Sequence, residues 1–193
     1  LISLRYPTLR EHIMQLLPPM EIAAKMAREK TKREHPEFSD EDICICFISP
    51  CPAKVSYIKN GFGDYKSEVD EVVSISDIYF NLLNVMRRGK VPVPFSRAGM
   101  IGISWATSGG ESSAIFNDKY LAADGIENVI RVLDQIENGN IPKLEFIELN
   151  ACTGGCVGGV MTIQNPFISR LLMVLNSYIY RNNSFASSFF VVS

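Results

Sequence analysis

Residues 144–159 read LEFIELNACTGGCVGG, and this stretch decides the fold that we expect. Its apolar first half predicts a strand that delivers Cys152 directly into a loop. Cys156 follows four residues later, with two glycines between the cysteines and two behind them. Thiolate is the preferred ligand of iron–sulfur clusters, and glycine lets backbone N–H groups approach an inorganic core. The stretch therefore predicts a strand that ends in a metallocluster loop.

A second strand leads to a third cysteine. Residues 42–49 are β-branched and apolar, which predicts a buried, parallel strand. Pro50 ends this strand, and Cys51 falls just past its carboxyl end. Ligands gather outside the carboxyl ends of strands in α/β sheets, so both cysteine loops are expected at binding edges.

The remaining pattern predicts an α/β fold with two small lobes, parallel sheets flanked by helices, and the cluster site between the lobes. The first lobe is expected over residues 1–92 and the second over 93–193, with a proline-rich linker at 90–97. Further strands are expected at 71–75 and 100–105. Helices are expected from Pro18–Pro19 to before Pro36, over 76–89 and 124–139, and from 166 through 175.

Composition bounds the partners. The chain has 193 residues, a formal charge of −2 and no basic patch, which argues against nucleic acid or an anionic membrane as a partner. The apolar runs are too short to span a bilayer. The odd number of cysteines, five, argues against a disulfide framework and fits a cytoplasmic protein.

Other interpretations of the cysteines stay open. Cys152 and Cys156 as a buried thiol pair beside a glycine turn is the simplest alternative. Zinc is disfavoured because no tight Cys-x-x-Cys knuckle exists. Cys44 and Cys46 alternate within the apolar strand and are expected in the core.

Two motifs carry a family resemblance. Pro50, Cys51 and Lys54 match the form Pro-Cys-x-x-Lys. Glu148, Cys152, Gly155 and Cys156 match Glu-x-x-x-Cys-x-x-Gly-Cys, and glycines follow. The chain thereby resembles the C-terminal, H-cluster domain of iron-only (di-iron) hydrogenases. Arg5-Tyr6-Pro7 and Asn165-Pro166-Phe167 extend the likeness over most of the chain.

The resemblance implies a 4Fe–4S cubane that one cysteine joins to a di-iron centre. Cys51 and Cys152 then look like cubane ligands, and Cys156 like the shared cysteine. Lys54 resembles the lysine that contacts a cyanide of the di-iron centre, and Glu148 a carboxylate near the cluster. Lys54 and Cys156 would be the catalytic residues on this interpretation.

The chain also departs from the family pattern. The family's first motif, with another cubane cysteine and a proton-relaying cysteine, would precede Leu1 and is not in this sequence. Ser49 and Asn150 stand where highly active members have methionines, and Met14 falls near their proton-path serine. Residues 108–112, SGGES, look more like the divergent, hydrogen-sensing branch. In that branch, ferredoxin-like or signalling domains are often attached.

Three functions follow as hypotheses. The first is reversible hydrogen oxidation and proton reduction with a ferredoxin-like domain or another redox partner. The second is hydrogen sensing or electron transfer with slow turnover. The third is a non-catalytic 4Fe–4S protein, such as a cluster-assembly relative. Three cysteines fill three of four usual ligand positions, so we expect the isolated chain to be inactive and, purified in air, to contain no iron.

Overall fold

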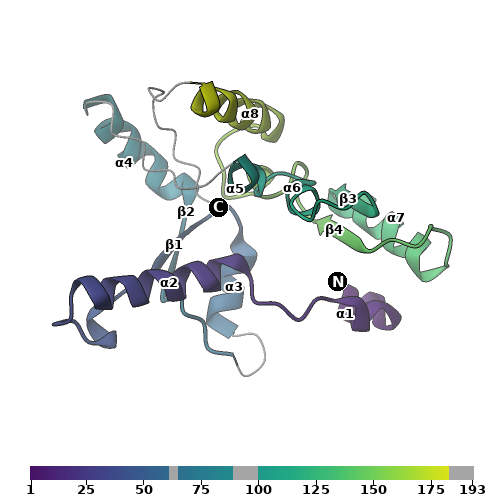
Figure 1. The fold of residues 1–193 in the computed structure, drawn as a ribbon, viewed down its shortest axis with the longest axis horizontal. Coiled ribbons are helices and arrows are strands. Elements are labelled where there is room, and N and C mark those ends of the chain that lie inside the picture. Colours follow the sequence, from purple (N-terminus) through teal and green to yellow (C-terminus); the bar gives the residue numbers. More distant parts are fainter. Residues whose placement is uncertain (61–64, 89–99, 183–193) are drawn as a thin grey trace.

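The computed structural model describes residues 1–60, 65–88 and 100–182. Two separate parallel sheets of two strands each organise the chain (Figure 1). β1 (Cys46–Ser49) pairs with β2 (Glu71–Ser74), and β3 (Tyr120–Asp124) pairs with β4 (Phe146–Asn150). Helices flank both pairs. This confirms the expected α/β class with two small parallel sheets.

Three helices accompany the first sheet: α2 (Pro19–Glu34), α3 (Pro52–Asn60) and α4 (Ile75–Arg88). The start of α2 near Pro18–Pro19 and its end before Pro36 confirm the sequence prediction. Proline suits the first turn because that turn has no use for the missing N–H. α4 begins directly after β2, where the Ser74 hydroxyl accepts a hydrogen bond from the Asp77 N–H at 3.0 Å. Ser74 therefore caps this helix, which begins one residue before the predicted start at residue 76.

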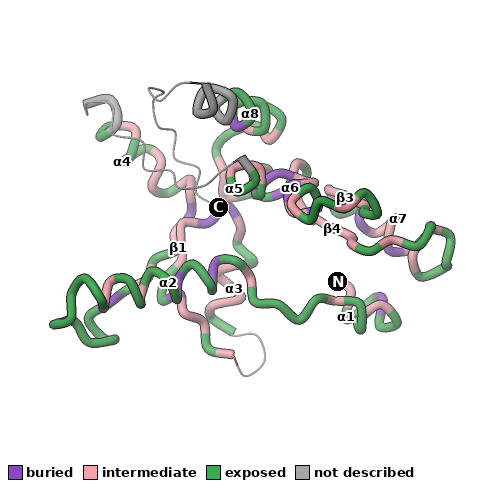
Figure 2. The backbone as a smooth tube through the Cα atoms, in the orientation of Figure 1, coloured by how far each residue is buried: buried purple, intermediate pink, exposed green. Residues whose placement is uncertain are grey.

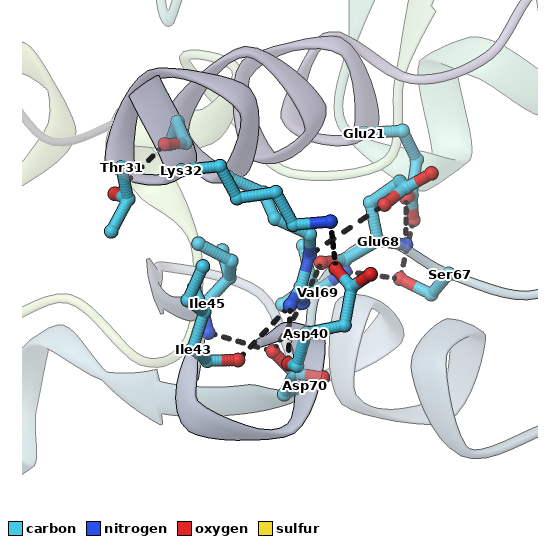
Figure 3. Close-up of polar contacts among 12 residues, drawn as sticks. Glu21, Thr31, Lys32, Asp40, Ile43, Ile45, Ser67, Glu68, Val69 and Asp70 are labelled. Carbon is cyan, nitrogen blue, oxygen red and sulfur yellow. Dashed lines mark hydrogen bonds and ion pairs between the residues drawn. The ribbon is translucent and has the colours of Figure 1, made fainter. Parts of the chain in front are cut away.

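Charged groups hold the amino ends of β1 and β2 together (Figure 3). Asp70 lies just before β2, and its Oδ2 accepts hydrogen bonds from the Ile45 N–H and the Arg28 guanidinium, both at 2.7 Å. Arg28 also donates to the carbonyl of Ile43 at 3.0 Å. The fully buried Glu21 on α2 accepts bonds from Ser67 Oγ and the Glu68 N–H, both at 2.7 Å. Polar contacts thus tie helix α2 to the segments that lead into β1 and β2.

The amino terminus packs against the second sheet's helix, α7 (Ile126–Glu137). Tyr6 lies between the short helices α1 (Ile2–Arg5) and η1 (Pro7–His12) and is 2% exposed. It forms the apolar core cluster with Val129 and Leu133, and its hydroxyl donates to Asp134 Oδ1 at 2.6 Å. Residues 1–12 therefore lie beside α7 rather than beside α2 (Figures 1 and 2).

Four further short elements and one longer helix complete the described residues: η2 (Asp40–Asp42), α5 (Met100–Ser104), α6 (Gly110–Ser113), η3 (Cys156–Gly158) and α8 (Pro166–Asn182). No helix in the described part of the chain is both long and apolar enough to cross a membrane.

Three sequence predictions are wrong in detail. Residues 100–104 are the helix α5 rather than a strand, and the Ser104 carbonyl accepts from the Thr107 N–H at 2.9 Å in a turn that follows. Strand β3 was not expected, although an apolar run before Asp124–Gly125 is a strand signal. Cys44 and Cys46 are exposed rather than in the core, because no element in the described residues covers their thiols.

Other predictions concern residues that the structure does not describe or a division that it does not test. The linker at 90–97 and the end of the helix at Gly89 lie outside the described residues. The division into lobes at residues 92 and 93 stays a prediction, and residues 1–12 lie with α7 of the second sheet.

Candidate functional site

The loop that carries Cys152 and Cys156 reaches from the second sheet to the first. It leaves β4 at Asn150, and its far end contacts the end of β1, where the Pro50 carbonyl accepts from the Met161 N–H at 3.1 Å. The Met161 carbonyl in turn accepts from the Ser76 N–H at 3.0 Å, at the start of α4. The carboxyl ends of both sheets are thus joined by this one loop.

Cys51 sits at the same junction, between β1 and α3. Ser49 is fully buried, and its hydroxyl lies 3.1 Å from both the N–H and the carbonyl of Cys51. The Cys51 carbonyl accepts from the Lys54 N–H at 3.2 Å, which begins the helix and places Lys54 on its first turn. The structure therefore brings Cys51, Lys54 and the 152–161 loop to one place.

Backbone neighbours account for three glycines of this loop, Gly155, Gly158 and Gly159. A Cβ on Gly155 would lie 2.6 Å from the Ser108 nitrogen, and Gly155 has φ 83° and ψ −150°, a conformation that only glycine adopts readily. A Cβ on Gly158 would collide with the Thr153 carbonyl, and one on Gly159 with the Pro50 carbonyl. The glycines are therefore required by close chain packing, whether or not a cluster is bound.

Backbone hydrogen bonds also connect the loop to the segment before α6. Thr107 and Gly155 form an antiparallel bridge, Ser108 N–H donates to the Gly154 carbonyl at 3.0 Å, and Val157 N–H donates to the Ala106 carbonyl at 3.2 Å. From β3, Asp124 Oδ2 accepts from the Gly154 N–H at 2.6 Å. Sequence reasoning missed Asp124, whose only signal is its place before a glycine at a strand end.

Glu148 on β4 holds α6 in place. It is 5% exposed and accepts four hydrogen bonds: from Gly109 N–H at 2.9 Å, Asn150 Nδ2 at 2.7 Å, Ser112 N–H at 2.9 Å and Ser112 Oγ at 2.8 Å. A carboxylate has about four lone-pair positions, so these donors satisfy it. Ser112, which is fully buried, is a second residue that the sequence did not single out.

Electrostatics connect the groups from the different elements. The Cys156 side chain reaches solvent, yet burial among the surrounding segments raises the pKa of its thiol. The positive charge of Lys54 lowers that pKa, whereas Cys51, Glu111 and Cys152 raise it. Burial, and then Cys51, raises the pKa of Cys152. The charges of Lys54 and of the other two thiols therefore act on Cys156.

The candidate donors at this junction are the thiols of Cys51, Cys152 and Cys156. Within the described residues, no three histidine, cysteine or acidic side chains converge closely enough for one metal ion. A 4Fe–4S cluster instead takes thiolates on separate irons. Cys44 and Cys46 lie too far away to bind the same cluster. Cys46 begins β1, and at about 3.3 Å per residue it lies on the order of 10 Å from the carboxyl end of that strand. Three thiols and a lysine thus fit part of a cluster's shell.

The chain matches one protein family over most of its length. A family model described as "Iron only hydrogenase large subunit, C-terminal domain" matches residues 1–91 and 95–160. A search of curated proteins found no match.

Two solved structures resemble this one. The first is HydA(deltaEFG), whose structure revealed stepwise FeFe-hydrogenase H-cluster assembly. It is 14% identical to this chain with a TM-score of 0.59, and the match covers 95% of this chain and 66% of that chain. The second is an FeFe-hydrogenase structure on oxygen inactivation, which begins with modification and degradation of the H cluster 2Fe subcluster. It is 13% identical to this chain with a TM-score of 0.58, and the match covers 91% of this chain and 62% of that chain. At such identities the likeness shows a shared fold. The chain spans less than two thirds of the length of these solved chains.

Proposed function

We propose a function from one premise: the chain belongs to the family formed by the C-terminal domain of the large subunit of iron only hydrogenases. In this proposal, Cys51, Cys152 and Cys156 bind a 4Fe–4S cluster as part of an H-cluster. The observation that carries it is that the segment of Cys51 and Lys54 and the loop of Cys152 and Cys156 meet where the carboxyl ends of the two sheets are joined.

Each residue has a role in this proposal. The three thiolates ligate iron, and Cys156 is the cysteine shared with a di-iron centre. Lys54 supplies positive charge and hydrogen bonds toward the anionic group, which tunes its potential. Glu148 acts as a positioning residue, because its lone pairs are already committed to α6 and Asn150. Bound iron would supply one-electron chemistry, and a fourth ligand must come from beyond these three cysteines.

Slow turnover or hydrogen sensing fits the site better than fast catalysis. Ser49 and Asn150, at positions that hold methionines in highly active relatives, are polar and bonded to Cys51 and Glu148. We therefore propose a cytoplasmic module that reacts with hydrogen and protons and exchanges electrons with a ferredoxin-like domain or other redox partner. A signalling domain in the same protein would fit sensing.

Reconstitution tests the ligand set. The full chain is incubated without oxygen with iron, sulfide and a small thiol that can supply the fourth ligand, and bound iron is counted. The changes Cys51→Ser, Cys152→Ser and Cys156→Ser should each lower the iron bound per chain. Cys44→Ser and Cys46→Ser are the matched controls, because both thiols are exposed and away from the site. Equal losses in both groups would refute the proposed ligands.

Infrared spectroscopy separates the remaining alternatives. After maturation with the di-iron cofactor, CO and cyanide bands with slow hydrogen turnover support the sensing proposal. Bands with fast turnover would favour a catalytic hydrogenase. A cluster with four irons and no CO bands would favour a 4Fe–4S electron-transfer or assembly protein.

A further inference from the structure

Cys44 and Cys46 are two exposed thiols that the proposed ligand set does not use. Ile45 separates them at the start of β1, and it is half-buried whereas both cysteines are exposed. Side chains two residues apart in an extended chain lie on the same face of a sheet. Both thiols therefore leave the chain on one face, opposite to the side chain of Ile45.

Hydrogen bonds fix the backbone between the two thiols (Figure 3). The Ile45 N–H donates to Asp70 Oδ2 at 2.7 Å. The Ile45 carbonyl accepts from the N–H groups of Asp70 at 3.0 Å and Glu71 at 3.2 Å. Both polar groups of Ile45 thus point toward β2, which is the geometry of an extended residue. The Cα atoms of Cys44 and Cys46 are then about 6.6 Å apart, which is two strand rises.

This spacing lets the two sulfur atoms hold one metal ion. Thiolate–metal bonds are about 2.3 Å long, so two of them span at most roughly 4.6 Å between the sulfur atoms. Rotation about each Cα–Cβ bond can turn the two thiols toward each other and bring the sulfur atoms to that separation. Cys44 and Cys46 can therefore bind opposite sides of one ion without any movement of the backbone.

The donor set selects a soft ion that needs few ligands. Thiolates favour Cu(I), zinc and iron–sulfur clusters. Zinc normally takes four ligands, and in the described residues no three cysteine, histidine or acidic side chains converge on one ion. Cu(I) is satisfied by two thiolates. Glu71 pairs with Cys46 in the register of β1 and β2, and its negative charge beside the thiols favours a cation.

We infer that Cys44 and Cys46 form a second metal site, a two-thiolate chelate for Cu(I). Binding of one ion displaces both thiol protons, so one Cu(I) and two thiols give a complex with one net negative charge and two protons in solvent. No electron is transferred. The inference does not rest on the proposed function, because Cys46 lies on the order of 10 Å from the carboxyl end of β1, where Cys51 follows.

Competition titration tests the chelate. The metal-free full chain is titrated with Cu(I) in the absence of oxygen, against a coloured Cu(I) chelator. The other thiols are removed together by Cys51→Ser, Cys152→Ser and Cys156→Ser. This triple variant should bind one Cu(I) per chain. Adding either Cys44→Ser or Cys46→Ser should weaken binding more than about 100-fold, beyond the roughly 10–100-fold that loss of a supporting residue costs at a metal site.

The single changes distinguish a chelate from two separate thiols. In a chelate, Cys44→Ser, Cys46→Ser and the two changes together all remove the same binding event. Two independent thiols would each keep part of the bound Cu(I) when the other is changed, and that result would overturn the inference. An affinity that rises with chain concentration would indicate an ion shared between two copies and would also overturn it, as would a triple variant that binds no Cu(I).

The wild type covers the case in which the triple variant does not fold. It should bind one more Cu(I) per chain than the variant Cys44→Ser/Cys46→Ser, with the same circular dichroism spectrum in both. Equal binding by the two chains would overturn the inference. Iron uptake plays no part in either measurement, so the inference and the proposed function succeed or fail separately.

Discussion

Gly155 offers the sharpest test of how the cysteine loop is built. The change Gly155→Ala adds one methyl group where the Ser108 nitrogen would lie 2.6 Å away and the Thr107 carbonyl carbon 2.9 Å away. Both neighbours are backbone atoms, so neither can rotate aside. The backbone of the loop or of residues 106–108 must move, and Cys156 moves with it.

The expected cost has two parts. Placing alanine at φ 83° and ψ −150° costs about 1–3 kcal/mol of strain. Displacing packed backbone costs about 1–3 kcal/mol more, as overpacking does elsewhere. The sum, about 2–6 kcal/mol, is a large share of the ~5–15 kcal/mol that stabilises a typical domain. Gly139→Ala is the matched control, with φ 67° and no atom within 4 Å of the new Cβ; it should cost only roughly 1–2 kcal/mol.

Urea unfolding of the full-length variants measures the difference. Both substitutions lower the entropy of the unfolded chain equally, so that effect cancels between them. Gly155→Ala should also bind less iron on reconstitution, whereas Gly139→Ala should bind as much as the wild type. If the two variants lose equal stability and bind equal iron, the loop does not pack against residues 106–108 as described.

Three further changes test the supports of the fold. Tyr6→Phe should cost about 1–2 kcal/mol in urea unfolding, because Asp134 loses a buried donor. Hydrogen bonds from Ile45 N–H and Arg28 hold the pKa of Asp70 below its usual value, so its contribution is present above the unfolded-state pKa and is lost as pH falls through the folded-state pKa. Asp70→Asn should therefore lower the urea midpoint at neutral pH and match the wild type in strong acid. Glu148→Gln should cost about 2–4 kcal/mol, because each carboxylate oxygen accepts from two donors and the new NH2 would face one of these pairs. The exposed Glu145→Gln should change stability little.

The sequence predicted an element correctly where a proline or an apolar run marks its start or its course. Pro18–Pro19 started a helix, and the apolar runs before Cys51 and Cys152 became strands. The strand predicted at residues 100–105 is wrong because a short apolar run suits a strand or a buried helix equally well. Cys44 failed for another reason: an apolar pattern predicts that a face can be buried, but burial needs a covering element, and the described residues supply none over that thiol.

The glycines of residues 154–159 show what pattern reading cannot separate. Their density suggested backbone approaching an inorganic core, but Gly155, Gly158 and Gly159 each have a protein backbone neighbour that excludes a side chain. Close approach to a cluster and close approach to protein backbone both require residues without side chains, because the loop joins the two sheets where the cysteine segments meet. Pro50, whose carbonyl accepts from Met161, likewise has two roles, since it ends β1 and fixes the loop beside Cys51. What holds the two sheets together is therefore also what sets the positions of the three thiols. Mutations of these glycines should lower stability and iron binding together.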